Sequence, residues 1–363
     1  MRAADLDYHL PDHLIATRPA EPRDAARLMV CRRDTGNVSH HHVRDLPSLD
    51  LLHRGDLLVA NRTRVLPAAF HATRDATAGK VHGLYLRTLP TTDDPRPHWQ
   101  VMFETRGKLQ PGERITFTDA PATLELLEPL APGQWRTRYL GDEPTESLLA
   151  RVGETPLPPY IQKARKARHE PPLSPDDPAR YNTVFADVPG SVAAPTAGLH
   201  FTDNLLRQLT VQGVHRTTLT LHVGLGTFLP IRTETLADHQ IHEEWLHIPA
   251  DTLDALRRTR AAGRKILVVG TTSVRALESL PDPLAPLTTD YTTHTRLFIR
   301  PDAGFQFRFT DMLLTNFHLP RSTLLALVAA LPGVGLDRLK QWYDQAIAHD
   351  YRFYSYGDAM LIV

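Results

Sequence analysis

The chain has 363 residues, of which 42% are hydrophobic, so it is long enough to form about two domains with cores of their own. Its 41 basic and 41 acidic side chains balance, which excludes a surface that is basic all over but not a local basic patch. The single cysteine, Cys31, excludes an intramolecular disulfide, an iron–sulfur cluster and a thiolate zinc site.

The opening stretch, MRAADLDYHLPDHLIATRP, is charged and interrupted by proline, unlike a signal peptide. No apolar run approaches membrane-spanning length, so we expect a cytoplasmic protein. We also expect it to act as a monomer. Residues 1–61 mix short strands and turns. They include a surface strand at VSHHHVRD and a buried strand at Asp56–Ala60.

Residues 62–153 have a different texture. Six short, partly alternating runs are separated by proline, glycine and aspartate: VLPAAFHATR, KVHGLYLR, HWQVMFET, ERITFT, ATLELLE and QWRTRYL. Runs at this spacing predict an antiparallel barrel or sandwich, closed by a short helix at ESLLARVG. We interpret 62–153 as a domain inserted into a discontinuous α/β domain of residues 1–61 and 154–363.

The second half of the chain begins with a polar, proline-rich stretch, KARKARHEPPLSPDDPAR, which we expect to be a loop. Its basic run, residues 163–168, would offer phosphate contacts if the partner is RNA. Helices then alternate with strands, which predicts a layered α/β domain. We expect Thr202, Asp251 and Ser322 to cap three of these helices, and Gly213 and Gly263 to end two of them.

Two segments carry patterns suited to an anionic or nucleotide ligand. KILVVGTTSVRALES begins a helix directly after a buried strand. The hydroxyls of Thr271, Thr272 and Ser273 lie beside unpaired backbone N–H groups that favour an anion, and Arg275 adds a bidentate donor. LHVGLGTFLPI contains Gly224 and Gly226 but lacks the third glycine and the helix of a dinucleotide fingerprint. These glycines still permit close backbone approach to a ligand.

The stretch ADHQIHEEWLHIP gathers histidines and glutamates without matching a metal motif. The zincin pattern needs histidines four residues apart, whereas His242 and His247 are five apart, so we predict no metal site. A general base formed by His242 with Glu244, on one side of a strand, is more plausible. A solvated strand face and a core position for His222 are the plain alternatives.

Near the C-terminus, LLTNFHLPRSTL places Asn316 and His318 between a strand and a helix, where α/β folds bind ligands. RFYSYGDAMLI supplies Tyr354 and Tyr356 for base stacking and Asp358 for a polar contact. Core packing is the alternative explanation for these aromatic residues.

Nine short sequence strings, each a weak signal by itself, are specific when taken together in this order: NRTRV, PLPPYI, YNTVF, AAPTAGLHF, LHVGLGTF, DHQIHEEW, GTTSVRALES, LLTNFHLPRSTL and RFYSYGDAM. Through them the chain resembles, from end to end, the S-adenosylmethionine:tRNA ribosyltransferase-isomerase family of queuosine biosynthesis. The resemblance implies an α/β domain interrupted by a β-barrel.

The resemblance also implies the reaction. The ribosyl moiety of S-adenosylmethionine is transferred to the aminomethyl group of 7-aminomethyl-7-deazaguanine in the wobble position of a tRNA with a GUN anticodon, and is isomerised. Epoxyqueuosine-tRNA, adenine and methionine are the products. S-adenosylmethionine is then a co-substrate, and no permanently bound cofactor is implied.

The chemistry begins with removal of a proton from the ribose methylene beside the sulfonium, which needs a positioned base and a dry site. We expect the base to be His222 or His242, with Glu244 orienting or replacing it, and His200 is the runner-up. For S-adenosylmethionine we expect contacts from Pro195, Thr196, Gly198, Gly224, Gly226, Thr227, Thr272, Ser273 and Arg275. For the deazaguanine and tRNA we expect contacts from Asn61, Thr63, Arg64, Lys80, Asn316, His318, Tyr356 and Asp358, with Arg87 joining Lys80 on the barrel.

The chain departs from the family pattern at three places. Arg62 stands where the family has a second asparagine, His82 stands where it has a carboxylate, and the turn RPDAGF is slightly lengthened. Three alternatives remain at this point. A methyltransferase predicts a glycine-rich turn that the chain lacks, a tRNA-binding relative without activity predicts damaged motifs, and a paralogue would act on another nucleoside.

Overall fold

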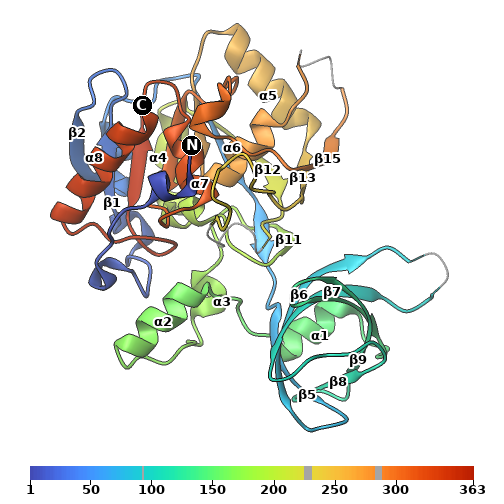
Figure 1. Cartoon of the computed structure of the whole chain (residues 1–363). Helices are drawn as coiled ribbons and strands as arrows, with labels where there is room; N and C mark the ends of the chain where they lie inside the picture. The colour runs from blue at the N-terminus through green and yellow to red at the C-terminus, as the bar shows by residue number, and fades with distance from the viewer. Residues whose placement is uncertain (92–93, 225–230, 283–287) are drawn as a thin grey trace.

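The computed structural model describes residues 1–91, 94–224, 231–282 and 288–363. Its main domain is built on one nine-stranded sheet (Figure 1). In spatial order the strands are β15 (Tyr291–Thr295), β13 (Glu244–Ile248), β12 (His215–Leu221), β3 (Leu57–Asn61), β14 (Ile266–Val269), β16 (Met312–Asn316), β17 (Ala359–Ile362), β1 (Arg27–Cys31) and β2 (Val38–His42).

Four adjacent strands at the centre of this sheet, β12, β3, β14 and β16, are parallel. Their carboxyl ends therefore lie at one edge, at Leu221, Asn61, Val269 and Asn316. Antiparallel strands complete both sides: β13 and β15 beyond β12, and β17 beyond β16. The strand predicted at VSHHHVRD is β2, a partly exposed edge strand paired with β1.

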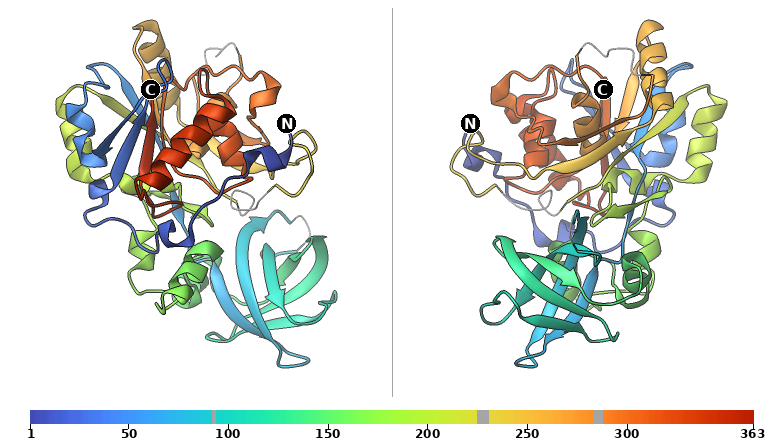
Figure 2. Two further views of the ribbon diagram at one scale, coloured as in Figure 1. Left: turned by 60° about the vertical axis from the view of Figure 1, so that its left-hand side comes forward. Right: turned by 90° about the vertical axis from the view of Figure 1, so that its right-hand side faces the viewer.

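Both faces of the sheet are covered, because alternate residues of each central strand enter different cores. In β3, Leu57 and Val59 belong to one core and Leu58 and Ala60 to the other. Four helices pack on the first face, and one α-helix with the 3-10 helix η4 (Val43–Ser48) packs on the second (Figure 2). The first set is α5 (Ala250–Ala261), α6 (Thr271–Glu278), α7 (Thr323–Ala329) and α8 (Gly335–Ala348), and the second is α4 (Asp203–Val211). The predicted layered α/β fold is confirmed.

Local sequence signals placed most helix ends correctly. Thr202 accepts a hydrogen bond from the N–H of Leu205 at the start of α4, and Ser322 does the same for Leu325 in α7. The prediction for Asp251 is wrong: α5 begins at Ala250 after Pro249, so Asp251 lies inside the first turn. A proline that precedes the first helical residue already sets the entry conformation of the chain.

The stretch 163–180, which we predicted to be a loop, is non-helical only at 168–176. Its two ends belong to helices α2 (Pro159–Ala167) and α3 (Asp177–Arg180). Proline at the first helical position costs no hydrogen bond, which is why PLPPYI opens a helix. Arg165 of the basic run is 2% exposed and forms a buried ion pair with Asp177, with nitrogen–oxygen distances of 2.7 Å. That side chain holds α2 to α3 instead of facing solvent.

The inserted segment folds as a closed six-stranded antiparallel barrel, as the alternating runs predicted. Around the barrel the strands are β10 (Gln134–Tyr139), β7 (His98–Thr105), β6 (Lys80–Leu89), β5 (Ala69–Arg74), β8 (Arg114–Phe117) and β9 (Thr123–Ala131). The predicted closing helix is α1 (Thr145–Val152), whose Leu148 and Leu149 enter the barrel core. Gly83 is required there, since a Cβ at this residue would lie 2.1 Å from the Phe70 ring.

A small parallel ribbon lies where the barrel joins the main domain. It pairs β4 (Thr63–Val65) with β11 (Val188–Ser191). β4 follows β3 after one residue, so the chain passes from the carboxyl edge of the large sheet through the ribbon into the barrel (Figure 1). Among the described residues, no helix is both long and apolar enough to cross a membrane.

Candidate active site

Asn61 joins three elements at the carboxyl edge of the sheet. It ends β3, it is 2% exposed, and its amide Nδ2 donates to the carbonyl of Leu221 (2.8 Å) and to Oγ1 of Thr272 (3.4 Å). Its Oδ1 accepts from the backbone N–H groups of Thr63 (3.0 Å) and Leu221 (3.2 Å). One side chain therefore fixes the ends of β12 and β3 relative to the start of α6.

His222 follows β12 at this edge and is held on three sides. Its Nδ1 lies 2.8 Å from the hydroxyl of Thr63, and its ring stacks on Trp245 with centroids 4.8 Å apart. A Cβ at Gly190, whose φ is +140°, would lie 2.6 Å from Nε2, so only glycine allows this close approach. Burial lowers the pKa of His222 to about 4, and the imidazole is neutral at physiological pH.

A small cavity of about 30 Å³ lies beside this group. That volume holds about one water molecule. Its wall is drawn from segments far apart in the sequence: Ala194, Pro195, Thr196, Ala197, Val223, Gly270, Thr271, Thr272, Thr315, Asn316, His318 and Leu324. The loop before η5 (Thr196–His200), the start of α6 and the residues after β16, which were predicted separately, thus meet at one place.

Asn316 organises the other side of the cavity. Its Oδ1 accepts a hydrogen bond from Thr196 Oγ1 (2.8 Å), and its Nδ2 lies 3.2 Å from Nε2 of His200 and 3.1 Å from the carbonyl of Tyr354. His200 is 3% exposed, and burial lowers its pKa to about 4. His318 is also buried, with its Nε2 2.9 Å from Thr315 Oγ1 and its pKa lowered to about 3.

The start of α6 faces the cavity through Thr271 and Thr272. Its N-cap, Gly270, has φ of +85° and gives no side-chain cap, so the first-turn N–H groups are not satisfied by a capping side chain. Ser273 points elsewhere: its hydroxyl donates to the carbonyl of Val269 (2.7 Å) within a fully buried environment. Of the three residues with hydroxyls predicted there, Thr271 and Thr272 lie on the cavity wall and Ser273 does not.

Glu244 and Arg275 form a buried ion pair behind the strand ends. Glu244 also accepts a hydrogen bond from the backbone N–H of Gly224 (3.0 Å), and Arg275 Nε donates to the carbonyl of Leu297 (3.0 Å). The expectation that His242 and Glu244 share a strand face is wrong, because β13 begins at Glu244 and His242 is exposed before it. Opposite charge and burial selected Arg275 as the partner of Glu244.

Several other predicted residues lie away from the cavity wall. Asp358 is 1% exposed and pairs with Arg27 (3.3 Å) and Arg352 (3.0 Å). Tyr356 is 1% exposed, with its ring edge-to-face against Tyr181, as in the core-packing alternative. In this conformation neither Asp358 nor Tyr356 offers a free face to a nucleobase of the tRNA.

The remaining predicted residues divide into three groups. Gly198 packs against Thr183, whereas Arg64 and Lys80 are exposed on β4 and at the start of β6. Gly226 and Thr227 lie outside the described residues. No three histidine, cysteine or acidic side chains in the described part of the chain are grouped so as to hold a metal ion.

Sequence reasoning missed two contributors to the site. They are Trp245, whose ring supports His222, and Gly190, which makes room for it. Gly190 lies 32 residues from His222, and no local pattern connects the two.

Comparison with known proteins gives a consistent result. A family model described as "Queuosine biosynthesis protein" matches residues 3–362. Proteins named S-adenosylmethionine:tRNA ribosyltransferase-isomerase from Novosphingobium aromaticivorans and Symbiobacterium thermophilum are 46% and 43% identical over 368 residues, and both alignments cover 100% of each chain. A crystal structure of S-adenosylmethionine tRNA ribosyltransferase from Thermotoga maritima is 32% identical, with a TM-score of 0.54 over 99% of this chain and 100% of that chain.

Proposed function

The chain belongs to the S-adenosylmethionine:tRNA ribosyltransferase-isomerase family of queuosine biosynthesis, and from that premise we propose how its own residues carry the reaction. The enzyme transfers the ribosyl moiety of S-adenosylmethionine to the aminomethyl group of a 7-deazaguanine at the tRNA wobble position. It isomerises that moiety and releases adenine and methionine.

His222 is the base that removes the proton from the ribose methylene beside the sulfonium. Its support is geometric: Nδ1 lies 2.8 Å from the hydroxyl of Thr63, and in the tautomer in which Nδ1–H donates to that hydroxyl the neutral ring presents a lone pair at Nε2. The lowered pKa keeps the ring neutral, and Trp245 holds its plane. His200, whose Nε2 lies 3.2 Å from Asn316 Nδ2, is the alternative base, and His318, whose Nε2 lies 2.9 Å from Thr315 Oγ1, lines the cavity.

The carboxylate of S-adenosylmethionine binds at the start of α6. The unoccupied first-turn N–H groups and the helix dipole favour an anion there. Arg275 is a positioning residue in this proposal, because Glu244 already neutralises it, and the pair holds Gly224 beside the ligand. The present cavity is too small for the nucleoside, so binding must displace part of the wall, for which we propose the segment that contributes Ala194–Ala197.

The deazaguanine enters from the side of the ribbon. Arg64 lies exposed on β4 next to the buried Thr63, so a phosphate on Arg64 would place the attached nucleotide near His222. Asn316, with its amide and carbonyl in the cavity wall, is the group proposed to recognise the base edge. The substrate, tRNA, supports a cytoplasmic location. We also propose action as a monomer and without a permanently bound cofactor.

One observation carries this proposal: Asn61 links the ends of β3 and β12 to α6, so that His222, which follows β12, and the start of α6, which lines the small cavity, lie at the same edge of the sheet. The test is to incubate the protein with S-adenosylmethionine and tRNA carrying the precursor base, and to weigh the digested nucleosides. We expect the mass of epoxyqueuosine together with free adenine. An unchanged precursor mass contradicts the proposal, and a gain of one methyl group would indicate a methyltransferase.

A further inference from the structure

A second cavity lies outside the site above, at one end of the barrel. It has a volume of about 660 Å³, within the range of about 300–1,000 Å³ that small-molecule sites occupy. The helix α1 covers the other end, since it follows the last residue of β10, whereas this cavity surrounds the start of β10 and the end of β7. It shares no lining residue with the cavity beside His222.

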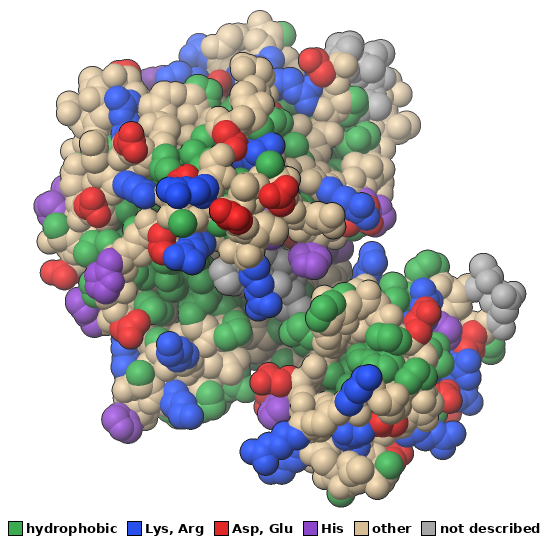
Figure 3. Space-filling view, viewed as in Figure 1, with side chains coloured by type: hydrophobic (Ala, Val, Ile, Leu, Met, Phe, Trp, Pro, Cys, Tyr) green, Lys and Arg blue, Asp and Glu red, His purple; other side chains and the backbone are tan. Residues whose placement is uncertain are grey.

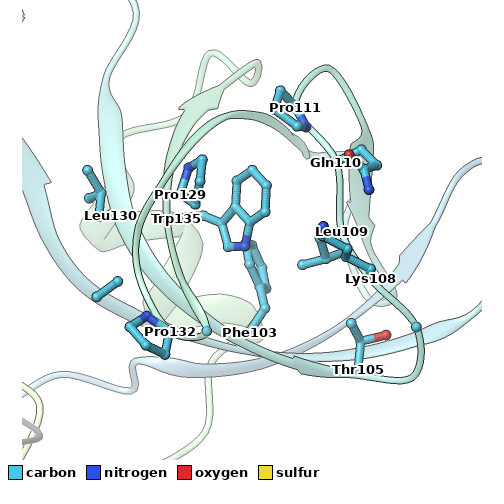
Figure 4. Close-up of a pocket in the computed structure, with 13 residues that line it drawn as sticks. Phe103, Thr105, Lys108, Leu109, Gln110, Pro111, Pro129, Leu130, Pro132 and Trp135 are labelled. Carbon is cyan, nitrogen blue, oxygen red and sulfur yellow. The ribbon is translucent and has the colours of Figure 1, made fainter.

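The cavity has an aromatic floor and rigid walls (Figure 4). Trp135 and Phe103 point into it, with Leu109 at their side, and each of the three is 7–8% exposed. The walls come from the β7–β8 loop and the β9–β10 hairpin, which contribute Pro111, Pro129 and Pro132. Leu130 on the lip is 41% exposed, one of two large hydrophobic side chains among the described residues that are so open to solvent.

One side of the rim is fixed by a single arginine. Arg74 forms an ion pair with Glu113 (2.7 Å) and donates to the backbone carbonyls of Arg106 and Lys108, both at 3.3 Å. The β7–β8 loop is therefore held open in one conformation before any ligand binds, which lowers the entropic cost of binding.

The charge on the rim is positive. Arg106 and Lys108 are exposed, and neither side chain forms an ion pair with a residue in the described part of the chain. Of the nearby carboxylates, Glu113 pairs with Arg74 and Glu128 with Arg136 (2.8 Å), whereas Glu104 is exposed on β7. On the face seen in Figure 3, the barrel carries hydrophobic side chains with lysine, arginine and acidic side chains around them. An aromatic pocket with a cationic rim suits a nucleobase and its phosphates.

We propose that this pocket binds an unpaired nucleobase of the substrate tRNA, one that does not react, with its flanking phosphates on Arg106 and Lys108. The proposal rests on the proposed function, which makes tRNA the partner. The barrel then holds the RNA at a second point while the wobble base enters the active site. Gln110 and Thr105 on the wall supply polar contacts to the base edge.

Equilibrium binding of unmodified tRNA, followed by anisotropy over a range of salt concentrations, tests the pocket without requiring turnover. Trp135→Leu keeps apolar volume but removes the stacking surface, and about tenfold weaker binding is expected, within the ~1–3 kcal/mol that a base stack contributes. The double variant Arg106→Ala/Lys108→Ala should lower the salt slope by about 1.4, for two contacts at ~0.7 each. Lys265→Ala, an exposed lysine at the opposite edge of the main sheet from the active site, is the control and should bind like the unmodified protein.

Melting temperature and S-adenosylmethionine affinity should be unchanged in all variants, which separates the pocket from folding and from the active site. If Trp135→Leu has a lowered melting temperature, Trp135→Phe is used as the test variant in its place. It keeps an aromatic ring, so it is expected to retain most of the affinity for tRNA. Wild-type binding by a folded Trp135→Leu overturns the proposal, and so does concentration-dependent dimerisation that the variant abolishes. If the wild-type protein shows no turnover but the variants still bind tRNA more weakly as expected, the proposed function is refuted and the proposal for the pocket is supported.

Discussion

The hydrogen bond between Thr63 and His222 allows the strongest test of the proposed base. Thr63→Val removes the hydroxyl that lies 2.8 Å from Nδ1 and keeps the shape of a side chain that is fully buried. The neutral ring then loses the partner that holds its proton on Nδ1. Leaving that donor unsatisfied costs about 1–3 kcal/mol, which favours the tautomer with its proton on Nε2.

That tautomer cannot accept a proton at Nε2, so the free-energy cost of reaching the reactive tautomer lowers kcat. At ~1.4 kcal/mol per factor of ten, kcat should fall about 5- to 150-fold. KM for S-adenosylmethionine should change little, because its proposed contacts lie at the start of α6. Adenine release measured by chromatography gives kcat, and calorimetry gives the affinity for S-adenosylmethionine.

Two controls make this result interpretable. Thr137→Val removes another fully buried hydroxyl, in the barrel, which donates to the carbonyl of Trp99 (3.3 Å), and should leave kcat unchanged. His222→Ala should abolish the base and cost about 10²–10⁴ in kcat. If His222→Ala is inactive but Thr63→Val turns over at the normal rate, the tautomer argument is wrong. A fully active His222→Ala would transfer the role of base to another group.

Three further predictions rest on burial and contacts described above. The acid limb of kcat/KM should lie near pH 4 and not near the ordinary histidine value of 6.5, because His222 accepts protons only when neutral and burial lowers its pKa to about 4; a limb at 6.5 would contradict this. Glu244→Gln leaves the charge of buried Arg275 unpaired and should lower the free energy of unfolding in urea by about 3–5 kcal/mol, whereas a loss under ~1 kcal/mol would mean that the pair is solvated. Gly83→Ala forces a methyl group to 2.1 Å from Phe70 and should destabilise the barrel, seen as early melting by calorimetry; a normal melting curve would show that the ring can move.

Much of the architecture follows from local patterns in the chain. Alternation of apolar residues predicted the six barrel strands, and helix–strand alternation predicted the layered domain, because these periods reflect which faces a segment can bury. The caps at Thr202 and Ser322 were predictable since a hydroxyl satisfies N–H groups two or three residues away. Family motifs located the segments that line the active-site cavity.

Tertiary structure alone decided which side chains in those segments meet. His242 and Glu244 are two residues apart, yet Glu244 pairs with Arg275 on another element, because β13 begins only at Glu244. Ser273 and Asp358 match ligand-binding patterns, but their polar groups are used within the protein. The Gly190–His222 approach joins residues that are distant in the chain. Sequence periodicity determines what each segment can bury, whereas a site depends on contacts between segments, and those exist only once the strands have been placed side by side.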